Sequence, residues 1–221
     1  MKDEELVTVM VPRSRLAEVP GIGPDDVLVE VEYCGICGTD LHLVLDGWGV
    51  PGRVGGHEWS GRVVAAGDGA GIDVGTLVAG SADATCGACD PCRAGRPSLC
   101  TNRAAAGDDG FQGAFAGFVA ARATTVAPVP AGVDARSAAY AEPLSVAMHA
   151  ITLAAPPPDA RVMVFGAGPV GAAIVAVLRG RGLSDIVVVE PGSTRRRRAA
   201  PLGAPTTTPA PLAQPGPPPQ R

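Results

Sequence analysis

The first two thirds of the chain alternate short apolar segments with turn residues. Apolar residues alternate or are β-branched within each segment, and glycine or proline follows at intervals typical of an all-β unit. The segments read LVTVMV, DVLVEVEYC, SGRVVAAG, GTLVAG and TTVAPVP. They predict a partly closed β-barrel or sandwich over residues 1–155. Its last part, SAAYAEPLSVAMHAITLAA (residues 137–155), has helical apolar spacing and is predicted to leave the barrel as a helix.

A different pattern begins after PPPD at residues 156–159. The segment RVMVFGAGPVGAAIVAVLRGRGLSDIVVVE consists of a buried strand, a glycine turn, a small-residue helix and a second buried strand. Residues 156–198 therefore form a partial Rossmann unit, and the fold class is α/β with a β-rich N-terminal part. An isolated βαβ unit is expected to leave its second strand as an open edge, with the apolar faces of GAAIVAVL and IVVVE uncovered.

Proline dominates the remainder, residues 199–221. Eight of the last 21 residues are proline, which opposes a regular helix or a central strand. We expect a disordered tail there.

Charge is distributed unevenly along the 221 residues, whose net charge is −4. All 22 acidic residues precede residue 191, and the remainder carries five arginines and no acid. The acidic body argues against nucleic-acid binding, and the run of four arginines is interpreted as a solvated face. No apolar run approaches the roughly 20 residues of a membrane span, and the acidic N-terminus lacks a signal-peptide pattern. We therefore expect a cytoplasmic protein without a membrane partner, in which six cysteines serve as metal ligands more readily than as disulfides.

The strongest local signal is CGACDPCRAGRPSLC. It holds four cysteines at spacings of two, two and seven residues, namely Cys86, Cys89, Cys92 and Cys100. Four thiolates form a closed tetrahedral zinc site with no open position, so the predicted role is structural. Iron in a rubredoxin-like setting, or disulfides, are the alternatives.

The turn VFGAGPVG has the G-x-G-x-x-G pattern of a dinucleotide site. The first glycine allows a tight turn, the second lets backbone approach a pyrophosphate, and the third lets the helix pack on the strand. The pyrophosphate would lie at the helix N-terminus, where free N–H groups favour anions. The predicted cofactor-binding residues are Gly166, Gly168, Pro169, Val170 and Gly171.

Glu190 follows the second strand, 19 residues after Gly171. An acid near this spacing binds the ribose 2′-hydroxyl of NAD and would repel the 2′-phosphate of NADP. Arg195–Arg198 could instead attract that phosphate. The sequence favours NAD over NADP.

Five stretches in order carry a family resemblance: CGICGTDLH, GGHEWSGRVVAAG, the cysteine lobe, AEPLSVAMHA and VFGAGPVG. Together they resemble the zinc-dependent medium-chain alcohol dehydrogenases, and within them the polyol, threonine and butanediol dehydrogenase branch. The resemblance covers residues from about 25 to 190. It implies a GroES-like catalytic domain over 1–155, followed by the start of a Rossmann domain.

The resemblance also implies a catalytic zinc ion bound by Cys37, His57 and Glu142. Three protein ligands would leave a fourth position for water or alcohol, as catalytic zinc requires. Glu58 would contact the metal transiently or lie behind it.

The residues around this centre acquire roles by the same match. Asp40 would accept a hydrogen bond from the far nitrogen of His57 and fix its tautomer. Thr39 and His42 would carry the alcohol proton to solvent.

The implied activity is oxidation of a secondary alcohol or polyol by hydride transfer to NAD, with one catalytic and one structural zinc ion. A Rossmann sheet needs two βαβαβ halves, of which we expect the second to be absent here. Members of the family are homo-oligomers, but we do not expect this chain to form the family's oligomer, because the resemblance stops before the returning segment that helps form the dimer. The pattern indicates a C-terminally truncated or frameshifted product, inactive alone. The rival hypothesis is a non-catalytic zinc-binding fragment or pseudogene product.

Overall fold

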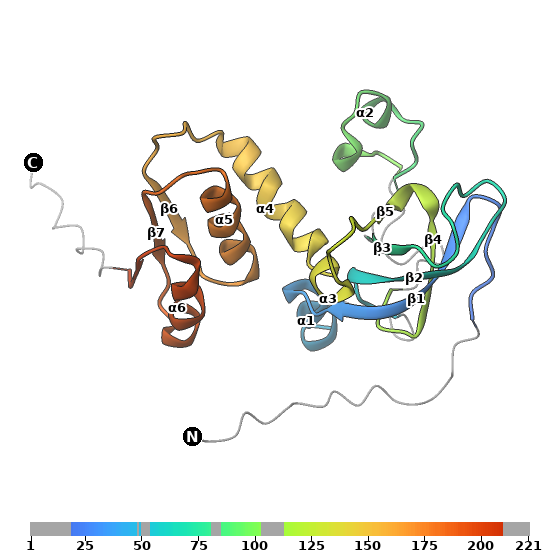
Figure 1. The fold of residues 1–221 in the computed structure, drawn as a ribbon, viewed down its shortest axis with the longest axis horizontal. Helices are drawn as coiled ribbons and strands as arrows, with labels where there is room; N and C mark the ends of the chain where they lie inside the picture. The colour runs from blue at the N-terminus through green and yellow to red at the C-terminus, as the bar shows by residue number, and fades with distance from the viewer. Residues whose placement is uncertain (1–18, 48, 50–53, 81–84, 103–112, 210–221) are drawn as a thin grey trace, which may run out of the picture.

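The computed structural model describes residues 19–47, 49, 54–80, 85–102 and 113–209. The β-rich part lies at the N-terminal end of one long helix, α4 (Ala141–Ala154), and the α/β part packs along this helix through α5 (Figure 1). The predicted strand at residues 6–11 lies outside the described residues, as does the end of the tail from residue 210.

The β-rich part is a curled five-stranded antiparallel sheet in the order β4-β1-β2-β3-β5. Every pairing in it is antiparallel, and Val29 on β1 lies opposite both Val63 on β2 and Val119 on β4. Inward-facing valines and Trp59 form its core. The strands are β1 (Asp26–Gly35), β2 (Glu58–Ala66), β3 (Leu77–Gly80), β4 (Phe118–Arg122) and β5 (Val126–Pro128).

Strand β4 was absent from the sequence prediction. Its five residues, FVAAR, show little alternation on their own. They become a strand because β1 presents a free edge on which they pair, which is a tertiary effect that local sequence does not encode.

Short helices lie between or after the strands of this part, namely α1 (Gly38–Leu45), α2 (Asp90–Arg93), η1 (Pro97–Leu99), η2 (Ala123–Thr125) and α3 (Ala135–Ala138). The helix predicted over 137–155 is thus two helices, α3 and α4. Asp134 caps α3 by accepting a hydrogen bond from the Ser137 backbone N–H at 2.7 Å. Helix α4 ends where Ala155 takes a left-handed conformation, just before Pro156.

The α/β part is a three-stranded parallel sheet in the order β6-β7-β8. Its core joins Val164, Val175, Leu178 and Ile186 to Ile151 of α4. The elements are β6 (Val162–Phe165), α5 (Pro169–Gly180), β7 (Ile186–Val189), α6 (Ser193–Ala199), η3 (Ala200–Leu202) and β8 (Thr206–Thr207).

Two expectations about this part were wrong. Regular structure does not stop at residue 198, because two β-branched threonines pair with β7 as the short strand β8. Strand β7 is therefore paired on both sides, and β6 and β8 are the edges of the described sheet. The apolar side chains of Met163 and Phe165, which share one face of β6, are 57% and 76% exposed, so this face is uncovered. The apolar face of α5 is also covered, since α4 packs on it.

No helix among the described residues is long and apolar enough to cross a membrane.

Gly80 provides a test of the barrel core. A Cβ added there would overlap the ring of Trp59, which is 1% exposed, whereas a Cβ at Gly117 would meet nothing within 4 Å. We expect Gly80→Ala to lower the free energy of unfolding by about 1–3 kcal/mol through overpacking, and Gly117→Ala to change it little. Urea denaturation of both variants measures this, and equal midpoints would contradict the packing described.

Candidate metal centre and dinucleotide site

Cys37, His57 and Glu58 form a candidate metal centre. Their ligand atoms, a thiol sulfur, a ring nitrogen and a carboxylate oxygen, all lie within 4.8 Å of one another. Cys37 precedes α1, and His57 precedes β2. The pairing of β1 with β2 sets Gly35 opposite Glu58, and a Cβ at Gly35 would overlap the Glu58 carboxylate, so glycine there leaves room for this side chain. Sulfur, imidazole and carboxylate donors fit zinc.

Asp40 contacts two members of this group, Cys37 and His57. Its side chain is 5% exposed, and one carboxylate oxygen accepts the Cys37 backbone N–H at 2.8 Å. The other oxygen lies 3.5 Å from Nδ1 of His57. With Nδ1 turned toward the carboxylate, Nε2 is the nitrogen available to a metal. The structure thus brings Asp40 and His57 together, as the sequence predicted.

The two predicted relay residues lie in different surroundings. The Thr39 hydroxyl oxygen is 3.7 Å from the Cys37 sulfur, so Thr39 borders the centre. His42 is exposed one turn further along α1, and its Nδ1 lies 2.6 Å from the Asp46 carboxylate. A chain of contacts through both residues remains a prediction.

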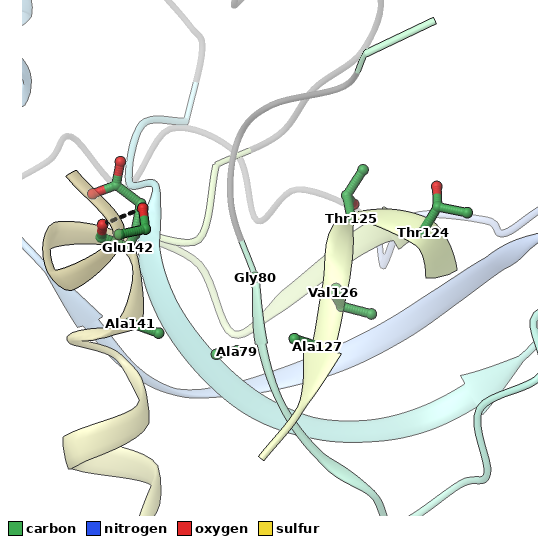
Figure 2. A pocket seen from close by; sticks show the side chains of 9 residues that line it. Ala79, Gly80, Thr124, Thr125, Val126, Ala127, Ala141 and Glu142 are labelled. Carbon is green, nitrogen blue, oxygen red and sulfur yellow. Dashed lines mark hydrogen bonds between the residues drawn. The ribbon is translucent and has the colours of Figure 1, made fainter. Parts of the chain in front are cut away.

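Glu142, the predicted third ligand, is not in the group of three that the described residues form. It lies in the first turn of α4 and lines a hollow of about 250 Å³. Figure 2 shows Glu142 on one side of this hollow and Thr124 and Thr125 on the other. The third donor of that group is Glu58, which directly follows His57 in the chain. A role of Glu142 as a zinc ligand remains a prediction.

Cys34 lies three positions before Cys37 in the chain but is not in the group of three donors. Burial, and then the Asp40 carboxylate, raise the pKa of Cys34 to about 11. Cys34 packs against the barrel core and is not one of the three donors of the candidate centre.

Tyr140 is a residue of this region that the sequence analysis missed. Its hydroxyl donates a hydrogen bond of 2.5 Å to the Pro169 carbonyl. Desolvation, and then the Glu58 charge, raise the pKa of this phenol. Tyrosine has no motif to mark it here, and the contact depends on the fold.

Four sulfur atoms gather in the cysteine lobe. Those of Cys86, Cys89, Cys92 and Cys100 lie within 4.8 Å of one another. The Cys100 sulfur is 3.6 Å from that of Cys86 and 3.8 Å from that of Cys89. These separations fit four ligands around one ion, and all six cysteines of the chain are free thiols.

Backbone N–H groups turn toward these sulfurs. The N–H groups of Cys92 and Thr101 lower the pKa of Cys89 to about 5, and those of Ala88 and Cys89 lower the pKa of Cys86. Desolvation raises the pKa of Cys92 to about 12. A divalent cation would compensate this desolvation and allow the remaining thiols to ionise.

The glycine turn after β6 has the shape that a pyrophosphate needs. Gly166 has a φ of +94°, which strongly favours glycine. A Cβ at Gly171 would overlap the Gly166 carbonyl oxygen, whereas a Cβ at Gly168 would meet nothing within 4 Å. The space above Gly168 at the start of α5 is therefore open to an anion, with Pro169 and Val170 exposed beside it.

Glu190 is buried and clamps this turn. It is 2% exposed, and its two oxygens accept the N–H groups of Ala167 at 2.9 Å and Gly192 at 2.7 Å. These bonds, and then the charges of Arg195 and Arg196, lower its pKa, so the carboxylate is ionised at neutral pH. Each carboxylate oxygen also keeps a lone pair that could accept from a further donor, such as a ribose hydroxyl. The contact with the ribose itself remains a prediction.

The arginine run contacts the segment that follows β7. Arg196 donates to the Glu190 carbonyl at 2.6 Å and to the Pro191 carbonyl at 2.5 Å, while Arg197 contacts the Thr194 hydroxyl at 3.1 Å. The run is therefore only in part the solvated face that was expected.

Residues 23–131 match the family model of the alcohol dehydrogenase GroES-like domain. L-threonine 3-dehydrogenases from Stenotrophomonas maltophilia (strain K279a) and Xanthomonas campestris pv. campestris (strain B100) are 36% and 37% identical to the chain over 193 residues. Among solved structures, a zinc-binding dehydrogenase from Sinorhizobium meliloti 1021 bound to NADP superimposes with a TM-score of 0.79 at 35% identity, over 86% of this chain. The chain belongs to the zinc-dependent medium-chain alcohol dehydrogenase family.

The structure of galactitol-1-phosphate dehydrogenase from Escherichia coli is also similar to this chain, with a TM-score of 0.79 and 28% identity over 85% of the chain. The matched regions make up 84–86% of this chain but 56% of each threonine dehydrogenase, 56% of the S. meliloti protein and 55% of the galactitol-1-phosphate enzyme. The chain therefore spans about half the length of the relatives it matches.

We expect this dehydrogenase-family chain to bind one zinc ion at each centre with unequal strength. The four-thiol site is closed and should resist chelation, whereas the three-donor site should lose its ion more easily. Cys37→Ala should then remove one zinc ion and leave the fold intact, while Cys89→Ala should unfold the lobe. Metal analysis before and after mild chelator treatment measures this.

Cys34→Ala is the matched control and should retain both ions. Loss of both ions in a single step from the wild-type protein would contradict two separate sites.

The glycine turn yields a pair of variants with opposite effects. Gly168→Ala should leave the melting temperature unchanged but weaken NADH binding about tenfold or more, because the new methyl group occupies the space open to the pyrophosphate. Gly171→Ala should lower stability by about 1–3 kcal/mol, because its methyl group overlaps the Gly166 carbonyl. Calorimetric melting and NADH titration of both variants measure the two effects. A Gly168→Ala protein that melts early and binds normally would reverse the assignment.

Proposed function

We propose that the chain supplies the zinc-binding part and the first dinucleotide-binding part of an enzyme that oxidises a secondary alcohol or polyol to a ketone. The observation that carries this proposal is the Cys37, His57 and Glu58 group on the same scaffold as the open glycine turn. One site suits a metal that binds an alcohol oxygen, and the other suits a cofactor that accepts hydride.

Zinc, when bound, would polarise the alcohol oxygen, and the nicotinamide would accept the hydride. The chain's own residues have three tasks. Cys37, His57 and Glu58 would hold the ion, and Asp40 would orient His57. Thr39 borders the place where the alcohol proton leaves, and we propose that it passes this proton toward His42 and solvent.

Glu142 is the carboxylate that the family resemblance assigns to the zinc ion. It lies at the start of α4, half-buried, beside a hollow that holds apolar and hydroxyl groups. We propose that Glu58 is the carboxylate ligand in this state and that Glu142 is the carboxylate that replaces it when a substrate occupies the centre.

NAD is the proposed cofactor, with NADP as the alternative. The ionised Glu190 carboxylate at the end of β7 supports NAD, because it would repel a 2′-phosphate. The NADP found on the S. meliloti relative and the nearby arginines support the alternative. Thiol ligands and free cysteines are compatible with a reducing compartment, so we propose a cytoplasmic location.

A non-catalytic zinc-binding role is the second candidate. The described residues supply three parallel strands, whereas a complete dinucleotide fold has six in two halves. The chain also spans only 56% of the length of its threonine dehydrogenase relatives. The three described strands alone would supply only part of the walls around a nicotinamide, so we do not expect turnover from these 221 residues by themselves.

The test joins this chain to the portion of the S. maltophilia threonine dehydrogenase that it does not span. We expect the joined protein to form NADH from at least one substrate in a panel of diols, polyols and threonine, and the chain alone to form none. Cys37→Ala in the joined protein should reduce kcat/KM by at least about 100-fold, since even residues that only orient metal ligands cost 10–100-fold.

Two carboxylate variants separate the ligands. Glu58→Gln should lower zinc content at the three-donor site, and Glu142→Gln should leave zinc content unchanged while lowering turnover. A joined protein that binds zinc and NADH but oxidises nothing in the panel would favour the non-catalytic role.

A further inference from the structure

Tyr140 lies where the β-rich part meets the α/β part. Its backbone forms the N-cap of α4, the helix that leads from one part to the other (Figure 1). Its hydroxyl crosses to the α/β part and donates to the Pro169 carbonyl at 2.5 Å, 29 residues along the chain.

Both ends of this contact adjoin a candidate site. Pro169 is the first residue of α5 and follows Gly168, above which the space is open. On the other side, α4, whose N-cap is Tyr140, contacts β2, the strand that begins with Glu58 of the metal group. Tyr140 thus connects the first residue of α5 to the helix that contacts this strand.

A purely local role does not account for this side chain. The Tyr140 side chain makes no capping hydrogen bond to α4, so helix initiation does not use the hydroxyl. The residue is 39% exposed, so much of the ring does not pack in a core. What the hydroxyl does is join two parts of the chain whose cores are separate.

We propose that Tyr140 is a positioning residue that sets the glycine turn, and hence the dinucleotide, relative to the metal centre. This rests on the proposed function in one respect: the benefit of positioning is hydride transfer, for which the reacting atoms must lie within about 3–3.5 Å. The hydrogen bond holds the first turn of α5 against the N-terminus of α4. Helix α4 is in turn anchored in the α/β core by Ile151.

Tyr140→Phe removes the hydroxyl and keeps the ring, and Tyr33→Phe is the matched control on the exposed face of β1. In the full chain loaded with zinc, we expect Tyr140→Phe to speed amide hydrogen exchange in residues 170–175 at unchanged zinc content and melting temperature. NADH should bind about three- to tenfold more weakly, as expected for the loss of one hydrogen bond. Tyr33→Phe should change neither quantity.

The exchange measurement needs no cofactor, so it separates this proposal from the proposed function. A wild-type chain that does not bind NADH would count against the proposed function, while faster exchange in Tyr140→Phe would still support the positioning contact. Unchanged exchange at residues 170–175 in Tyr140→Phe would overturn the proposal. In the joined protein, Tyr140→Phe should lower kcat with little change in the KM for alcohol, and a change confined to that KM would also overturn it.

Discussion

The buried carboxylate of Asp40 is the constraint on which the candidate metal centre depends. A buried carboxylate is costly unless it is hydrogen-bonded. Asp40 meets this requirement with the Cys37 N–H at 2.8 Å and the nearby His57 ring at 3.5 Å. One residue therefore ties the start of α1 to the start of β2. The pairing of Gly35 with Glu58 then adds the third donor, so the geometry of the centre follows from a single strand register and a single buried charge.

Helix α4 is the second element that both sites share. Its N-terminal turn carries Glu142 and adjoins the barrel, and its later residue Ile151 belongs to the core of the α/β part. Because Tyr140 at the N-terminus of α4 bonds to Pro169 at the start of α5, the glycine turn lies near the same end of α4 that adjoins the barrel. The α/β part depends on this helix for cover as well, since α4 packs on the apolar face of α5.

Features that depend on local spacing could be predicted from the sequence. The four lobe cysteines and the three turn glycines lie as predicted, because tight turns and short gaps restrict where these residues can point. Features that depend on long-range pairing could not be. Strand β4 exists because β1 has a free edge, and the Thr206–Thr207 strand exists because β7 has one. Proline content opposed a central strand there, and the strand that forms is at the edge of the sheet.

Which carboxylate lies beside Cys37 and His57 also depends on the fold and not on local spacing. Glu58 and Glu142 are both acids in matching motifs, and their distances to Cys37 and His57 are set by the fold. Glu190 was predicted only as a ribose ligand, yet its two backbone hydrogen bonds also hold the turn in shape. A buried acid can thus have a structural role and a binding role together, and sequence spacing reveals only the second.

The central claim is that this chain folds around two distinct metal centres. Anomalous diffraction at the zinc absorption edge, from crystals of the zinc-loaded protein, tests it most directly. The account predicts one peak among the sulfurs of Cys86, Cys89, Cys92 and Cys100 and a second between Cys37, His57 and Glu58. A map with density among the four sulfurs and none at Cys37 and His57 would contradict it.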